Sequence, residues 1–128
     1  MEQRFLADSN TIIDYIGNKM PEKASLVLDG YFNEGFTLSI VSKIEVLGFN
    51  GNDDELKRIA DFIALGSVVF IDDSIADKTI EIRKTHRTKL PDAIIAATAF
   101  VYGLTLISRN INDFKNIQGL TVIDPHTL

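Results

Sequence analysis

Short apolar runs alternate with longer amphipathic segments along the whole chain. The runs RFLAD, FTLSI, SVVFI, TLIS and LTVID have the length and composition of strands, at residues 4–8, 36–40, 67–71, 105–108 and 120–124. The segments between them carry apolar residues at helical spacing, over residues 9–18, 22–34, 41–49, 53–65, 73–86 and 91–102. Strands that alternate with helices are typical of a parallel sheet with helices on both faces. The sequence therefore predicts an α/β fold.

The length and composition predict a single domain over residues 1–128 that is not embedded in a membrane. A chain of 128 residues can bury a hydrophobic core. No apolar stretch approaches the roughly 20 residues that span a bilayer, and the first ten residues, MEQRFLADSN, lack the apolar core of a signal peptide. The absence of cysteine excludes disulfides, thiolate metal sites and a cysteine nucleophile. We therefore expect a cytoplasmic protein.

The charge of the chain is acidic, with one basic exception. The net charge of −5 argues against broad, nonspecific binding to nucleic acid. Residues 83–89 read RKTHRTK, and we name their cations the basic lip: Arg83, Lys84, Arg87 and Lys89. These cations can complement the dipole at a helix C-terminus, or they can form an edge that receives a polyanionic substrate. His86 is the only histidine of this segment. A lone histidine in a basic stretch is more often a solvated surface residue than a general base.

Four acids lie beside elements whose ends should meet at one edge of a parallel sheet. Asp8 closes the first strand, Glu45 lies in the helix at 41–49, Asp92 opens the apolar helix, and Asp113 follows the strand at 105–108. Ligands of such folds bind at the edge where the strands end. Asp8 and Asp113 could each simply cap a helix or turn, and Asp92 suits a first helical turn.

Two of these acids are expected to be half-buried. Glu45 neighbours the apolar Ile44 and Leu47, and Asp92 precedes Ile95 on its own side of a helix. A desolvated carboxylate needs a compensating charge, and several carboxylates together need a cation between them. Hard oxygen ligands suit Mg²⁺ or Mn²⁺, and such ions support in-line hydrolysis of phosphodiesters. A metal-dependent phosphodiesterase is therefore the chemistry that these residues predict.

Two other kinds of chemistry fit the sequence less well. A phosphoacceptor receiver domain is also a small acidic α/β protein, and VVFIDDS supplies the acid pair Asp72 and Asp73 after a strand. A receiver, however, needs that pair after its first strand, so these two acids are better explained as helix caps. Ser9 and Ser42 lack the histidine and acid partners of a serine nucleophile.

Three segments, in this order, resemble PIN-domain ribonucleases: FLADSNTIIDYI, SIVSKIEVLGF and KLPDAIIAATAFVYGLTLISRNINDF. More narrowly, they are similar to the VapC-type toxins of bacterial and archaeal toxin–antitoxin pairs. The resemblance covers nearly the whole chain, and the last segment is its most specific part. It implies a PIN-domain three-layer α/β/α sandwich with a central parallel sheet, usually dimeric, and an endoribonuclease that depends on Mg²⁺ or Mn²⁺. It also implies a small cognate antitoxin whose tail occupies the active-site groove.

The resemblance also implies roles for individual residues. The catalytic, metal-binding acids are Asp8, Glu45, Asp92 and Asp113, and the segment RNINDF offers Asn110 as well at the fourth position. Asn10 stands where the family often has a residue that orients the first aspartate, and Ser108 and Asn110 occupy polar positions of the outer metal shell. Because the protein is acidic, RNA binding would depend on the basic lip and on Arg109 and Lys115. A PIN-like binding module without catalysis is the alternative.

Overall fold

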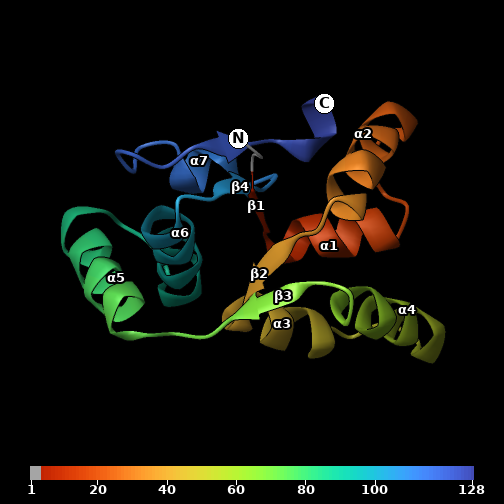
Figure 1. Cartoon of the computed structure of the whole chain (residues 1–128), viewed down its shortest axis with the longest axis horizontal. Helices are drawn as coiled ribbons and strands as arrows, with labels where there is room; N and C mark the ends of the chain where they lie inside the picture. Colours follow the sequence, from red (N-terminus) through yellow and green to blue (C-terminus); the bar gives the residue numbers. More distant parts are fainter. Residues whose placement is uncertain (1–3) are drawn as a thin grey trace.

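The computed structural model describes residues 4–128, so the first three residues of the predicted domain lie outside the described residues (Figure 1). A five-stranded parallel sheet forms the centre, in the order β3-β2-β1-β4-β5. The strands are β1 (Phe5–Ala7), β2 (Thr37–Ser39), β3 (Ser67–Val69), β4 (Thr105–Ile107) and β5 (Val122–Ile123). All five predicted strands are confirmed, each a little shorter than predicted.

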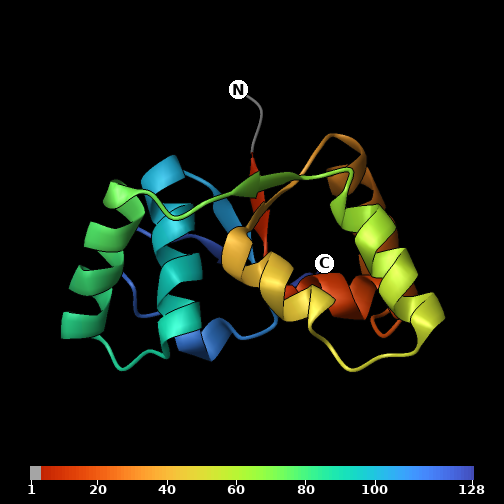
Figure 2. The same cartoon turned by 90° about the horizontal axis from the view of Figure 1, so that it is seen from below.

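Helices cover both faces of this sheet, as predicted. They are α1 (Ser9–Ile16), α2 (Glu22–Asn33), α3 (Ile40–Leu47), α4 (Asp53–Ile63), α5 (Asp73–Thr85), α6 (Leu90–Tyr102), α7 (Ile111–Phe114) and the 3₁₀ helix η1 (Pro125–Thr127). Figures 1 and 2 show α5 and α6 on one side of the sheet and α1, α2 and α4 on the other. The short α7 and η1 were not predicted. Within residues 4–128, no helix is long and apolar enough to cross a membrane.

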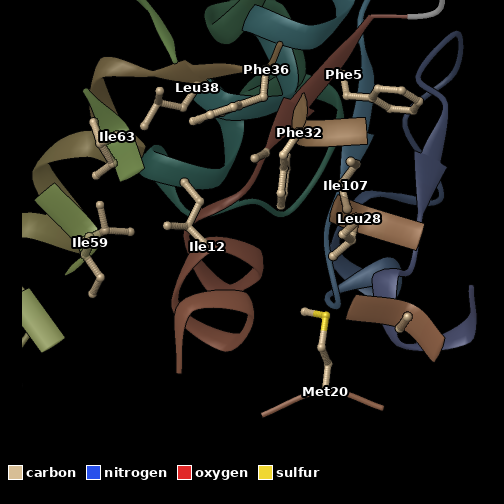
Figure 3. Close-up of a cluster of buried hydrophobic side chains, with 13 residues drawn as sticks. Phe5, Ile12, Met20, Leu28, Phe32, Phe36, Leu38, Ile59, Ile63 and Ile107 are labelled. Atoms are coloured by element: carbon tan, nitrogen blue, oxygen red, sulfur yellow. The ribbon is translucent and has the colours of Figure 1, made fainter. Parts of the chain in front are cut away.

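The alternation of side chains along β1 divides the core into two clusters. Phe5 and Ala7 face the cluster under α1, α2 and α4, whereas Leu6 faces the cluster under α5 and α6. Figure 3 shows the first cluster, which includes Phe32 and Phe36. The rings of these two residues meet edge to face, with centroids 5.3 Å apart. All three side chains of β1 are therefore buried among apolar residues, and Asp8 is the first polar side chain after the strand.

The helix α6 is buried on nearly all sides, as its apolar sequence predicted. Six consecutive or nearly consecutive side chains on it are buried: Ala93, Ile95, Ala96, Ala97, Thr98 and Ala99. Most of these side chains are small, so α6 can pack closely against both the sheet and α5. The chain leaves α6 at Gly103, whose φ of 64° is a left-handed conformation that glycine adopts without strain. This packing fixes the position of the N-terminal turn of α6, which carries Asp92.

Candidate functional site

Asp8 is held rigidly at the end of β1. Its side chain is buried, and it caps α1 by accepting a 2.8 Å hydrogen bond from the Ser9 N–H on Oδ1. Its Oδ2 accepts bonds from Ser108 Oγ at 2.6 Å and from Asn10 Nδ2 at 3.3 Å. Ser108 is in reach because β1 pairs with β4 in register and both strands end at the same level. The predicted capping role of Asp8 is therefore confirmed, and one of its oxygens is oriented by neighbours from two segments.

Glu45 lies on α3 and accepts a 2.6 Å hydrogen bond from Ser9 Oγ. Our prediction that Glu45 is half-buried is wrong, because its side chain is exposed. The helix packs inward through Ser42 and Val46, while the apolar neighbours Ile44 and Leu47 are themselves 65% and 40% exposed. The argument from desolvation therefore fails for Glu45, although the side chain still reaches the residue that follows Asp8.

Asp92 is half-buried in the first turn of α6, as predicted. Burial is the largest cause that raises the pKa of this carboxyl, followed by the negative charges of Asp8, Asp113 and Glu45, and Lys89 opposes them. The pKa that results is about 6. Burial likewise raises the pKa of Asp8, opposed by its hydrogen bonds from Ser108 and Ser9. The acids from four separate segments are thus close enough to repel one another.

Three of the four predicted acids share one surface hollow of about 330 Å³. Its lining residues are Asp8, Ser9, Asn10, Ile13, Glu45, Asp92 and Asn110. Asp113 is exposed on α7 and lines a second hollow, together with Arg109 and Asn110. Because Asn110 lines both hollows and Asp113 perturbs the pKa values of Asp8 and Asp92, the fourth acid lies at the margin of the site.

The predicted supporting polar residues lie around Asp8. The Asn10 amide group is oriented from both ends: its Nδ2 donates to Asp8, and its Oδ1 accepts the Arg109 N–H at 3.2 Å. Ser108 Oγ accepts the Asn110 N–H at 3.1 Å while it donates to Asp8. The loop after β4 is therefore tied to the start of α1 by backbone and side-chain hydrogen bonds.

The donor set fits a hard divalent cation, since it consists of carboxylate and amide oxygens. The pKa values of Asp8 and Asp92 are raised chiefly by burial and in addition by the neighbouring carboxylates, and a cation bound between them would offset both effects. Among residues 4–128, however, no three acid or histidine side chains are placed closely enough to hold a metal ion together as they stand. An open arrangement is compatible with Mg²⁺, which keeps several waters and uses few protein ligands.

The basic lip lies at the end of α5 and the start of α6. Arg83, His86, Arg87 and Lys89 line a hollow of about 420 Å³ with Thr88. Within the described residues, the basic lip forms no ion pair with a carboxylate. Arg83 and Lys84 also occupy the last turn of α5, so the helix-dipole interpretation is compatible with this placement.

His86, a candidate general base, and Asp72, an acid of the receiver hypothesis, both have structural roles. The His86 ring contacts Thr85 Oγ1 at 2.8 Å and the Asn116 carbonyl at 3.0 Å, and it does not line the acidic hollow. Asp72 caps α5 by accepting a 2.8 Å bond from the Ile75 N–H, as we predicted. The receiver interpretation has no support from these acids.

The sequence analysis missed Asp14, which is buried on α1. Its Oδ2 lies 2.9 Å from Arg109 Nη1 and 3.2 Å from His126 Nε2. An acid one helical turn after Asn10, next to the apolar Ile13, is the signal that could have revealed it. Arg109, predicted as a possible RNA contact, therefore has an internal partner.

Comparison with known proteins identifies the family. Residues 5–120 match the PIN domain. The chain belongs to the PIN domain family. This PIN domain is 53% identical to Ribonuclease VapC1 of Rickettsia felis over 32 residues, and that alignment covers 25% of this chain and 24% of the relative.

Solved structures extend the similarity to the whole PIN domain. A toxin–antitoxin complex from Klebsiella pneumoniae contains a chain that is 28% identical, with a TM-score of 0.78 and coverage of 94% of this chain and 97% of that one. DNA-bound VapBC from Salmonella typhimurium contains a chain that is 25% identical, with a TM-score of 0.81 and coverage of 97% and 99%. The predicted PIN-domain fold, a parallel sheet between two helical layers, is therefore confirmed.

Proposed function

We propose that this PIN domain is a metal-dependent endoribonuclease that hydrolyses RNA phosphodiester bonds and acts as the toxin of a type II toxin–antitoxin pair. The observation that carries the proposal is the hollow in which the carboxylates of Asp8, Glu45 and Asp92 meet. The similarity to a ribonuclease and to chains of toxin–antitoxin complexes supports it. Hydrolysis of phosphodiesters is the reaction that suits carboxylates, a hard cation and neighbouring basic residues.

The metal ligands in this proposal are Asp8, Glu45 and Asp92, with Asp113 at the margin as the fourth acid. A bound Mg²⁺ or Mn²⁺ would activate a water and would supply positive charge that stabilises the departing oxygen. Asp92, whose pKa is raised to about 6, must lose its proton for the site to be loaded, so loading weakens as the pH falls below about 6. Ser108 donates to Asp8 Oδ2 and thereby fixes the orientation of this carboxylate, which lines the hollow.

The substrate strand is proposed to run from the acidic hollow across the basic lip. Lys89 lowers the pKa of Asp92, which places its charge near the acids. Arg87 in the loop between α5 and α6 and Arg83 in the last turn of α5 line the neighbouring hollow with Lys89. Cations without carboxylate partners are free to neutralise phosphates and release counterions. Replacement of Lys57 is the control for this path, because Lys57 is an exposed lysine on α4, on the other side of the sheet.

We also propose two protein partners. The toxin–antitoxin complexes among the similar structures support a small cognate antitoxin, whose tail would cover the acidic hollow. Ile44 and Leu47 lie exposed beside Glu45 on α3 and could be buried by that tail. A homodimer is the state that the family resemblance implies, and light scattering of the isolated protein measures it.

The test is cleavage of total cellular RNA by purified protein without antitoxin, with Mg²⁺, with Mn²⁺ and with EDTA. We expect discrete fragments that require the metal and disappear in Asp92→Asn. The matched control is Asp77→Asn, which removes the same charge from an exposed position on α5 and should cleave normally. Cleavage by Asp92→Asn at the wild-type rate would refute the site. No cleavage by folded protein with either metal would favour a non-catalytic binding module.

A further inference from the structure

The buried carboxylate of Asp14 connects three parts of the chain that are distant in sequence. Asp14 is on α1, and its side chain is only 7% exposed. It binds Arg109 from the loop after β4 and His126 from η1. A carboxylate this buried is costly to desolvate unless cationic donors compensate it. We name these three residues the Asp14 clamp.

Arg109 holds the same face of α1 at two points. Its backbone N–H donates to Asn10 Oδ1, and its guanidinium donates to Asp14, which lies one helical turn further along. The amide of Asn10 in turn donates to Asp8 Oδ2. The Arg109 side chain is 52% exposed and has no other carboxylate partner among residues 4–128. Without Asp14, nothing in the described chain would anchor this side chain to α1.

The loop that Arg109 anchors carries much of the proposed site. Ser108, the residue before Arg109, donates to Asp8, and Asn110, the residue after it, lines the acidic hollow. The same loop leads into α7, which carries Asp113. A shift of this loop would therefore change the position of Ser108 and Asp113 relative to Asp8.

We propose that Asp14 is a positioning residue of the proposed metal site. It fixes the loop 108–110 against α1 through Arg109, so that Ser108, Asn110 and Asp113 stay in register with Asp8. His126 adds the C-terminal turn to the same anchor. This inference takes from the proposed function only the reaction that is performed at the site. The positioning itself is a property of the protein without metal or RNA.

The first measurement is hydrogen–deuterium exchange of metal-free protein, for wild type, Asp14→Ala and Arg109→Ala. We expect faster exchange over residues 108–113 in both variants, because the loop loses the side-chain contact, which is one of the two points at which Arg109 is held to α1. Arg109→Ala keeps the Asp14–His126 contact and removes an exposed side chain, so it provides the measurement even where Asp14→Ala fails to fold. The control is Asp29→Ala, which removes a carboxylate that binds Tyr15 between α1 and α2 and leaves the loop untouched.

The second measurement is the affinity for Mn²⁺ alone, followed from free Mn²⁺ by electron paramagnetic resonance. Loss of a residue that orients metal ligands typically weakens affinity 10- to 100-fold, and we expect about tenfold for Asp14→Ala. Arg109→Lys retains a cation at this position, so it should keep most of the wild-type affinity for Mn²⁺. Unchanged exchange over 108–113, or faster exchange with unchanged Mn²⁺ affinity, would overturn the inference. Wild-type protein that binds Mn²⁺ but cleaves no RNA would refute the ribonuclease function alone.

Discussion

Replacing Asp92 with asparagine should stabilise the metal-free protein while it removes activity. The rise of the Asp92 pKa from 3.8 to about 6 corresponds to about 3 kcal/mol, at about 1.4 kcal/mol per unit. Because the side chain is only half-buried, solvent screening reduces the effect to about 1–2 kcal/mol. For a domain of this size, that difference raises Tm by about 4–7 °C.

The pH dependence of this effect has a definite sign. Asp92 binds its proton more tightly in the folded protein than in the unfolded chain, so the wild type loses stability as the pH rises from about 4 to about 6. Above about 6 the loss is complete. Asparagine carries no charge, so the advantage of Asp92→Asn should be full at pH 7.5 and should shrink as the pH falls towards 4.

The assay is thermal or urea unfolding in EDTA at several pH values, with Asp77→Asn as the control for loss of one negative charge. The addition of Mn²⁺ should then raise the Tm of the wild type, because the ion binds only the folded state, and should raise that of Asp92→Asn much less. An Asp92→Asn variant that is less stable than the wild type at pH 7.5 in EDTA would refute the reasoning. So would a stability difference that does not change with pH.

Three further predictions concern the hydrogen bonds, the basic lip and a turn. Ser108→Ala removes a bond that lowers the pKa of Asp8, so metal-dependent cleavage should slow about tenfold and its pH profile should shift upward. Arg87→Ala with Lys89→Ala should reduce the salt slope of RNA binding by about 1.4, at about 0.7 per lost phosphate contact; an unchanged slope in a filter-binding titration would move the substrate path elsewhere. Gly119→Ala should lower the free energy of unfolding by about 1–3 kcal/mol in urea titrations, because φ is 84° there and the new Cβ would lie 2.7 Å from a phenylalanine ring.

The fold could be predicted because local patterns determine it. Each strand is a short apolar run, and each long helix has a turn or capping signal at its start, such as Pro91 at the start of α6. The positions of Asp8 and Asp92 in the site follow from the same patterns. One acid closes the central strand, and the other opens the most apolar helix, so the parallel topology brings them to the same edge.

The sequence does not predict how neighbouring helices and loops pack against one another, and three features of the candidate site depend on that packing. The two-turn helix α3 packs through Ser42 and Val46, so Glu45 is exposed even though its sequence neighbours are apolar. The contact between Asp14 and Arg109 joins residues that are 95 positions apart, and no local periodicity encodes it. Asp113 depends on the path of a loop, and the structure places it at the margin of the site rather than within the shared hollow.

The central position of β1 has a consequence for how the protein is made. Of the five described strands, β1 is synthesised first, but one of its two neighbours in the sheet is β4, at residues 105–107. Until β4 has been synthesised, Asp8 has neither Ser108 as a donor nor the loop that carries Asp113. Domains fold as units, so a nascent chain cannot assemble the proposed nuclease site before β4 and the loop after it have been synthesised.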